Sequence, residues 1–346
     1  MMHRLLTLLA ALALAGPAAA EPHPLFAADE TIRLTIRGPV GAIRRAAERE
    51  TDAHDATLVL AGPAPESHAI RLSARGLSRR RRDVCTFPPL RIEFVANPGA
   101  TSFFRGQRRL KLVTHCQQSD SFQQHLLLEY AAYRLLNLLS PRSLRVRLAA
   151  IDYAEGGASA PFVSRLGFLI EDVDDAARRN GLVEIETGNI AAGRLSPGDA
   201  ARAALFMYMI GNLDWSMVAG PAGDSCCHNF KLLGAAAGAT GGLIPIPYDF
   251  DYSGLVDAPY AVPPDQVSVA SVRTRRYRGY CAHNAEAQAA AAEFRAARAT
   301  LLAVPGAIPG LSARNRDRAV AYLSRFFDDI GDARAVSSNL LGTCLR

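Results

Sequence analysis

The stretch IPIPYDFDYSG, residues 244–254, shapes the expectations for the rest of the chain. Its apolar half predicts a buried strand, and Asp249 and Asp251 follow that strand directly. A second segment, GNLDWS at 211–216, places Asp214 just after a predicted helix in the same way. Side chains at the ends of buried elements can point into a cleft, so we expect both segments to contribute to one functional site.

An asparagine lies between the two segments, in the sequence Cys226-Cys227-His228-Asn229. Carboxylate oxygens beside an asparagine are hard ligands of the kind that Mg²⁺ prefers, and a further aspartate can serve as a base. The pattern therefore favours a metal-assisted site. The alternative interpretation is a pair of hairpin turns whose carboxylates are solvated.

Lys111 and Glu129 lie upstream, on two successive predicted elements. A strand predicted at 108–115 carries Lys111, and a helix predicted at 118–139 places Glu129 on an apolar stripe with helical spacing. A carboxylate among apolar neighbours needs a cation, and Lys111 is its expected partner. If Glu129 instead lies at the margin of the stripe, its carboxylate reaches water.

The positive charges of this chain are almost all arginines. Its 346 residues have a net charge of +6 and include 37 arginines but only two lysines, Lys111 and Lys231. We expect at least one lysine to mark a place where a compact ammonium is needed, although codon bias and chance would give the same count. The dense basic run at 79–82 lies in a loop predicted at 76–83, which either covers phosphates or forms a solvated hairpin tip. It has no interleaved aromatic residues, so nucleic-acid binding is not favoured.

Strand patterns dominate the first half of the chain and helical patterns the second. Strands are expected at 31–37, 56–60, 70–75, 89–95, 108–115, 144–153 and 165–171, and a hairpin at 229–233 and 243–248. Helices are expected at 42–49, 118–139, 173–179, 199–210, 286–303 and 313–330. The predicted organisation is a sheet-rich lobe at 21–172 and a mainly helical lobe at 173–346 that carries the hairpin.

The first 20 residues have the pattern of a secretory signal peptide. Arg4 precedes the apolar run 5–14, and an A-x-A cleavage site at 18–20 precedes Glu21. No later run reaches about 18 apolar residues, so no transmembrane segment is expected after cleavage. We therefore expect a periplasmic or secreted protein that begins at Glu21.

Six cysteines follow the predicted signal peptide, and an even number in an exported chain favours disulfides. Cys85 and Cys116 bracket a predicted strand pair and are expected to form one bond. A bond between Cys281 and either Cys226 or Cys227 is a further expectation.

The chain resembles the CotH (spore-coat protein H) kinase family over roughly residues 65–255. The motifs that carry the resemblance are Arg75-Gly76-x-Ser78, Asn212-x-Asp214, His228-Asn229-Phe230-x-Leu232 and Pro247-Tyr248-Asp249-Phe250-Asp251. It implies an α+β, bilobal, protein-kinase-like fold with an N-terminal antiparallel sheet lobe that has one helix and a mainly helical C-terminal lobe. The implied activity is the transfer of phosphate from ATP or another nucleotide to a hydroxyl acceptor, with Mg²⁺ or Mn²⁺. The acceptor is open between a protein, a lipid, a glycan and a small molecule.

The resemblance also implies a role for each site residue. Asp214 would orient or deprotonate the acceptor hydroxyl. Asn229 and Asp249 would bind the metal, and Asp251 would hold a second metal or brace the turn. The remaining implied residues contact the nucleotide: Lys111 and Glu129 as a phosphate-anchoring ion pair, Arg75 and Ser78 in the loop, and Glu171 near the hinge.

Two other functions are compatible with the sequence. Because an exported protein lacks an evident source of ATP, the chain could be a catalytically inactive kinase-like binding or assembly module of the cell envelope. A metal hydrolase would instead use Asp214, Asp249, Asp251 and His228, but no helix shows the H-x-x-x-H spacing of a metal site.

Overall fold

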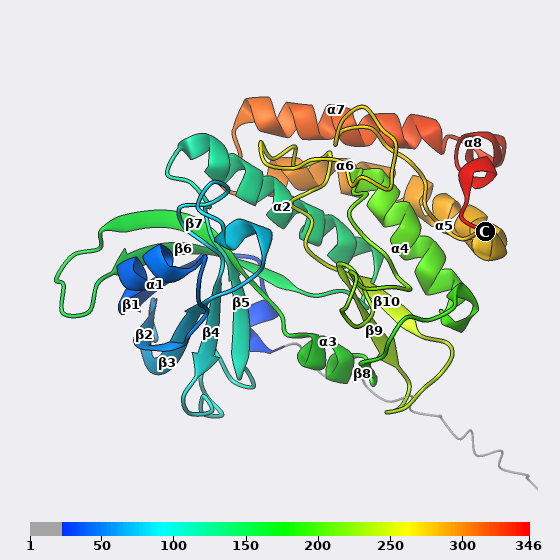
Figure 1. Ribbon diagram of the computed structural model, residues 1–346. Helices are drawn as coiled ribbons and strands as arrows, with labels where there is room; N and C mark the ends of the chain where they lie inside the picture. The colour runs from blue at the N-terminus through cyan, green and yellow to red at the C-terminus, as the bar shows by residue number, and fades with distance from the viewer. Residues whose placement is uncertain (1–22) are drawn as a thin grey trace, which may run out of the picture.

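A closed barrel of seven strands occupies the N-terminal half of the computed structural model, which describes residues 23–346 (Figure 1). The strand order is β1-β2-β3-β4-β5-β7-β6, and the parallel pairing of β1 with β6 closes a barrel whose other pairs are antiparallel. The strands are β1 (Ile32–Arg37), β2 (His54–Ala61), β3 (Glu66–Ala74), β4 (Leu90–Phe94), β5 (Arg109–Val113), β6 (Val146–Ala154) and β7 (Val163–Ile170). The signal peptide predicted at 1–20 and the expected start at Glu21 lie outside the described residues.

Alternating side chains fill the barrel. Leu34 and Ile36 on β1 are buried, as are Leu72 on β3 and Ile92 on β4, while the residues between them are more exposed. Successive side chains of a strand point to opposite faces, so this period of two places one apolar set inside a closed sheet. The interior residues form a hydrophobic core of their own.

A second, larger core is built mainly by helices. They are α1 (Val40–Ala46), α2 (Asp120–Leu139), α3 (Val173–Arg179), α4 (Pro197–Ile210), α5 (Asn284–Ala296), α6 (Arg298–Ala307), α7 (Ala313–Asp329) and α8 (Ala333–Asn339). A three-stranded sheet in the order β10-β9-β8 joins them, with β8 (Val183–Ile185), β9 (Phe230–Gly234) and β10 (Ile244–Pro247). In Figure 1, α2 runs between the barrel and the C-terminal helices.

The expected protein-kinase-like, bilobal α+β fold with an antiparallel sheet lobe and one helix is wrong. The sheet is a closed mixed barrel, and the described N-terminal half contains both α1 and α2. The larger core also runs without a break from α2 and the outer faces of β6 and β7 to α7. The physical reason is the long-range β1–β6 pairing, in which Ile32 lies opposite Ala149. Local alternation predicts each strand but carries no information about that partner.

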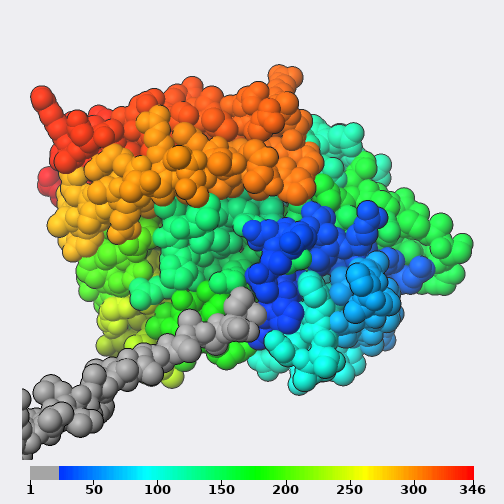
Figure 2. Space-filling view, turned by 180° about the vertical axis from the view of Figure 1, so that it is seen from behind, coloured from blue at the N-terminus to red at the C-terminus, as the bar shows by residue number. Residues whose placement is uncertain are grey.

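One helical prediction also needs correction, and one helix was missed. The pattern at 286–303 predicted a single helix, but α5 ends at Ala296 and α6 begins at Arg298. The short helix α8 was not predicted. Figure 2 shows the C-terminal helices, coloured orange to red, across the upper left and centre of the molecule. Among the described residues, no helix combines the length and the apolar character needed to cross a membrane.

Three disulfides join all six cysteines. The predicted bond between Cys85 and Cys116 is confirmed. The expected bond to Cys281 is wrong, because Cys281 pairs with Cys344 at the C-terminus. Cys226 pairs with its neighbour Cys227.

Candidate functional site

Left-handed backbone positions bring the polar side chains of the site together. Gly211 ends α4 with a φ of 66°, and the chain continues from there to Asp214. Asn229 and Asp249 flank the β9–β10 hairpin with φ angles of 53° and 64°. Asparagine and aspartate adopt this conformation more readily than other residues with a Cβ atom. The backbone N–H of Tyr248 donates to the Asn229 carbonyl at 3.1 Å, which holds the two ends of the hairpin together.

Asp214 is oriented by three neighbouring residues. His228 Nε2 lies 2.9 Å from Asp214 Oδ1, and Asn229 Nδ2 donates to Asp214 Oδ2 at 3.0 Å. The backbone N–H of Asp214 donates to Asn212 Oδ1 at 2.9 Å. The hydrogen bond to Asp214 raises the pKa of His228. Because the Asp214 side chain is still 29% exposed, an oriented carboxylate remains open to a ligand.

Glu129, Asp249 and Asp251 form an acidic cluster about the end of β10. One oxygen from each carboxylate lies within 4.8 Å of the other two. Glu129 and Asp251 are buried, whereas the Asp249 side chain is 39% exposed. Three carboxylates at this separation are a suitable ligand set for Mg²⁺ or Mn²⁺. Of the predicted metal ligands, the structure therefore groups Asp249 and Asp251 with Glu129, while the amide nitrogen of Asn229 bonds to Asp214.

Arg79 inserts its guanidinium among these three carboxylates. Its Nη1 lies 3.1 Å from Glu129 Oε2, its Nη2 lies 3.0 Å from Asp249 Oδ1, and its Nε lies 3.3 Å from Asp251 Oδ2. Each nitrogen faces a different carboxylate, an arrangement that the planar fork of arginine allows and a lysine ammonium does not. Arg79 is itself buried, so the cluster contains a cation supplied by the chain.

Three carboxyl groups of the acidic cluster share the single guanidinium of Arg79. Burial raises the pKa of Glu129 to about 8 and that of Asp251 to about 6, against the lowering effect of the guanidinium. Glu129 Oε1 is buried without a hydrogen-bond partner among the described residues. An unpartnered buried oxygen and three carboxylates for one guanidinium both favour an additional cation, so the residues fit a metal ion.

Lys111 does not form the expected ion pair with Glu129. Its Nζ lies 5.0 Å from the centre of the Tyr248 ring, and no carboxylate oxygen of the described chain lies within 4.0 Å of it. Burial, together with the charges of Arg75 and Lys231, lowers the pKa of Lys111 to about 8. The ion-pair partner of Glu129 is Arg79 instead, because the loop at 76–83 folds over the carboxylates.

The only two lysines of the chain line the same cavity, whose volume is about 230 Å³. Lys231 Nζ pairs with Glu184 Oε1 at 2.7 Å, and Lys111 lies beside it on β5. Arg109 and Asp172 also line this cavity, so its charges are mixed. A cavity bounded by β5, β8 and β9 can accept a flat polar ligand that carries its own negative charge.

Arg75 and Ser78 both precede Arg79 in the loop after β3. Burial lowers the pKa of Arg75, and the nearby charge of Asp249 opposes this effect. Ser78 begins the short 3₁₀ helix at Ser78–Arg80, and its side chain acts on the pKa of Tyr252. The structure therefore places Arg75 beside the acidic cluster and Ser78 in the adjoining turn, near Tyr252.

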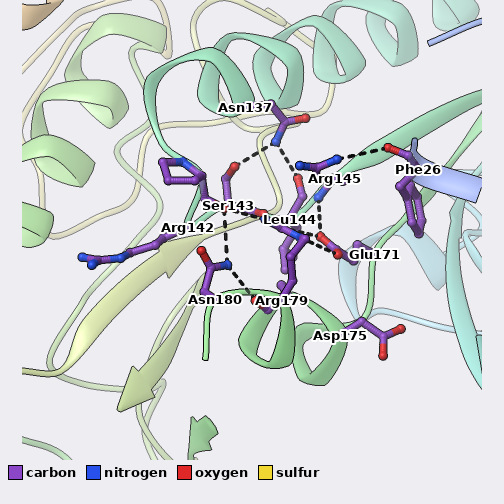
Figure 3. A network of polar contacts seen from close by, with 12 residues as sticks. Phe26, Asn137, Arg142, Ser143, Leu144, Arg145, Glu171, Asp175, Arg179 and Asn180 are labelled. Carbon is purple, nitrogen blue, oxygen red and sulfur yellow. Dashed lines mark hydrogen bonds and ion pairs between the residues drawn. The ribbon is translucent and has the colours of Figure 1, made fainter. Parts of the chain in front are cut away.

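Glu171 has a different set of neighbours from the other predicted site residues (Figure 3). Its Oε1 accepts from Arg179 Nε at 3.1 Å, and its Oε2 accepts from Arg179 Nη2 at 2.9 Å. The backbone N–H of Arg145 also donates to Oε2 at 2.9 Å. With 2% of its surface exposed, Glu171 joins the end of β7 to α3 and the start of β6.

Two residues of the site were not predicted from the sequence. Arg79 was only one of four consecutive arginines, and the clue to its role was the need of buried Glu129 for a cation. Tyr133, one helical turn after Glu129, accepts a hydrogen bond from the backbone N–H of Asp249 at 2.9 Å. Its place on the apolar stripe of the helix gave no sign of this contact.

No protein-family model matches the chain, and no curated protein shows significant sequence similarity to it. The chemistry of the site must therefore be inferred from its own residues.

Proposed function

We propose that the protein is a Mg²⁺-dependent phosphotransferase that moves a phosphate from ATP or another nucleotide to a hydroxyl acceptor. One observation carries the proposal: the acidic cluster of Glu129, Asp249 and Asp251 lies close in the fold to a separate, oriented carboxylate, Asp214. Asn212, two residues before Asp214, donates its Nδ2 to the Asp249 carbonyl at 3.4 Å, and, in addition to burial, the charge of Asp214 helps to raise the pKa of Asp251. Phosphoryl transfer needs a metal site that neutralises phosphate charge and a group that positions the attacking hydroxyl. The CotH-like motifs are consistent with this proposal, and an exported, periplasmic or secreted location is part of it.

The proposed roles follow from the contacts of each residue. Glu129, Asp249 and Asp251 would hold the metal, which when bound neutralises charge on the transferred phosphate. Asp214 would accept a hydrogen bond from the acceptor hydroxyl and take its proton, because His228 and Asn229 fix the carboxylate in one orientation.

The nucleotide would bind beside the lysine cavity. Lys111 and Arg75 supply positive charge near Asp249, and burial strengthens their interaction with phosphate oxygens. The cavity is lined by both positive and negative side chains, so it can accept an uncharged base next to a charged phosphate chain. The acceptor stays open between a protein, a lipid, a glycan and a small molecule.

Thermal stability measured with Mg²⁺ and ATP, and with Mn²⁺ and other nucleotides, tests the binding step. A ligand at 100 times its Kd should stabilise the protein by about 2.7 kcal/mol, which a thermal shift detects. Asp249→Asn should abolish this shift, whereas Asp55→Asn, which removes an exposed carboxylate on β2, should leave it unchanged. Transfer of labelled phosphate to candidate acceptors tests the chemical step. The absence of a shift with every metal and nucleotide would contradict the proposal.

The position of Arg79 favours a second candidate, a catalytically inactive binding or assembly module of the cell envelope. A guanidinium that already contacts all three carboxylates can replace the metal as the structural cation. This candidate predicts that the purified protein binds nucleotide without Mg²⁺ and transfers no labelled phosphate. Metal-dependent binding followed by transfer would exclude it.

A further inference from the structure

A second pocket lies between α1, the loop after β3 and the segment before α2. It has a volume of about 480 Å³ and is lined by Gly41, Arg44, Arg45, Arg82, Thr86, Gln117 and Gln118. Three of these residues are arginines and none is acidic. The cavity beside the lysines and the large cavity at the end of the barrel both contain glutamates among their arginines. The lining of this pocket therefore carries only positive charges, whereas the linings of the other two cavities carry charges of both signs.

The floor of the pocket is held rigidly. Thr86 follows Cys85, and Gln117 follows Cys116, so the Cys85–Cys116 disulfide fixes the two segments beneath it. The Thr86 hydroxyl donates to Gln117 Oε1 at 3.0 Å, and Gln117 Nε2 donates to the Val84 carbonyl at 2.8 Å. Polar groups that are already ordered lose little entropy when a ligand binds.

The neighbours of Arg44 hold its guanidinium in place but leave its two terminal nitrogens without a hydrogen bond in the described chain. Its guanidinium carbon lies 4.7 Å from the centre of the Phe87 ring and 5.9 Å from that of Phe162. Its Nε donates to the Thr86 carbonyl at 3.1 Å, and this is the one hydrogen bond of its side chain within the described chain. Two terminal nitrogens thus remain for a ligand, and the planar fork matches the oxygens of phosphate or sulfate.

The acidic residues around the pocket offset only part of its charge. Glu155 is the one carboxylate that acts on Arg44, and it lies at the edge of the pocket, where its Oε1 accepts from the backbone N–H of Gly41 at 2.7 Å, against three lining arginines. Asp83 pairs with Arg81 rather than with Arg82. Arg45 and Arg82 are exposed at the rim. A ligand with one negative group would meet Arg44 on the floor, and a second group would meet the two rim arginines.

We propose that this pocket binds a ligand with at least two phosphate or sulfate groups. The volume exceeds the needs of a single phosphate, and the amides of Gln117 and Gln118 can bond to hydroxyl or ester oxygens between the charged groups. The inference does not depend on phosphate transfer, because none of the lining residues belongs to the acidic cluster or contacts Asp214.

Pyrophosphate is the soluble probe, measured by calorimetry in EDTA so that metal at the acidic cluster makes no contribution. Arg45→Gln and Arg82→Gln should each weaken pyrophosphate binding roughly 10-fold, and the double variant should weaken it further. Arg33→Gln/Arg105→Gln is the matched control, since it removes two arginines from the cavity at the barrel end. These four arginines are exposed, so the variants should fold, which circular dichroism checks.

Sedimentation with phosphatidylcholine vesicles, with and without cardiolipin, a lipid with two phosphate groups, distinguishes a lipid headgroup from a free ligand. Binding of pyrophosphate alone assigns a soluble ligand, and binding of cardiolipin vesicles assigns a membrane surface. Either result supports the pocket if Arg45→Gln/Arg82→Gln removes it and the control retains it. No binding in either experiment, or equal loss in the control, would overturn the inference.

Discussion

Arg79 and Glu129 form a buried ion pair, with 3.1 Å between Arg79 Nη1 and Glu129 Oε2. The same guanidinium reaches Asp249 and Asp251, so one side chain connects the loop after β3 to α2 and to the end of β10. An arginine in this position competes with a metal ion for the same oxygens.

Arg79→Gln should therefore have two opposite effects. Without metal, the variant should lose about 3–5 kcal/mol of unfolding free energy, because buried carboxylates lose their cation. With Mg²⁺, it should gain more stability than the wild type gains, because the competing guanidinium is gone. Denaturant titrations with and without Mg²⁺ measure both effects. Arg81→Gln, which removes an exposed arginine two residues away, is the control, and an equal Mg²⁺ gain in Arg79→Gln and wild type would contradict competition.

Substitution of Asp214 should separate binding from chemistry. Asp214→Asn keeps the size of the side chain but removes the base, so phosphate transfer should fall by roughly 10²–10⁴-fold while the nucleotide-dependent thermal shift is retained. His228→Gln should have a smaller effect, because Asn229 still bonds to the carboxylate. If His228→Gln instead abolished activity on simple phosphoesters while Asn229→Ala did not, a metal hydrolase would be the better interpretation.

Local patterns predicted the elements of this fold but not the pairings that close it. Val173–Arg179 forms the predicted helix with the same bounds, because Asp172 caps its N-terminus through a local contact with the N–H of Asp174. The β1–β6 pairing joins residues more than a hundred positions apart, and nothing in either strand specifies the other. Closure of the barrel therefore could not be predicted from alternation.

The same contrast applies to the site. The requirement that Glu129 have a cation followed from its apolar neighbours, and a cation is present. Its identity did not follow, since Arg79 and Lys111 have similar charge and both precede Glu129 in the sequence. The choice depends on shape: three carboxylates surround a planar fork, whereas Lys111 packs against the Tyr248 ring.

Glu171→Gln should reduce stability without affecting nucleotide binding. The carboxylate makes two hydrogen bonds to Arg179 and one to the backbone of Arg145, all in a buried setting (Figure 3). Removing its charge leaves Arg179 without a buried counter-ion, which should cost about 3 kcal/mol or more. Denaturant unfolding gives the stability and calorimetry the nucleotide Kd. If the folded variant instead bound nucleotide with a Kd increased tenfold or more, Glu171 would contribute to the nucleotide site.

Lys111→Met should weaken nucleotide binding more than Lys231→Met does. Lys111 has no carboxylate partner within 4.0 Å in the described chain, whereas Lys231 is engaged by Glu184. A free ammonium is available to a phosphate, and its loss should cost roughly 10-fold or more in Kd. Calorimetry with both variants provides a matched comparison, because these are the only lysines of the chain. If both variants raised the nucleotide Kd equally, the free ammonium of Lys111 would have no special role in nucleotide binding.

His115 should make the protein less stable in mild acid. Its side chain is 1% exposed, and neither ring nitrogen has a hydrogen-bond partner among the described residues. Burial, assisted by the positive charges of Arg165 and Arg44, lowers the pKa of His115 to about 3. In the unfolded chain its pKa is about 6.5, so below that pH the unfolded state binds a proton that the folded state excludes. Folding is therefore penalised as the pH falls from about 6.5 toward 3.

The expected loss is about 1.4 kcal/mol of unfolding free energy for each pH unit, or roughly 2 kcal/mol between pH 6.5 and pH 5. His115→Leu should flatten this part of the stability profile, because it removes the group that takes up the proton in the unfolded chain. Denaturant unfolding at a series of pH values measures the slope. His54→Leu, at a less buried histidine on β2, is the matched control. If His115→Leu and wild type had parallel profiles between pH 5 and pH 6.5, another group would be responsible for the acid sensitivity.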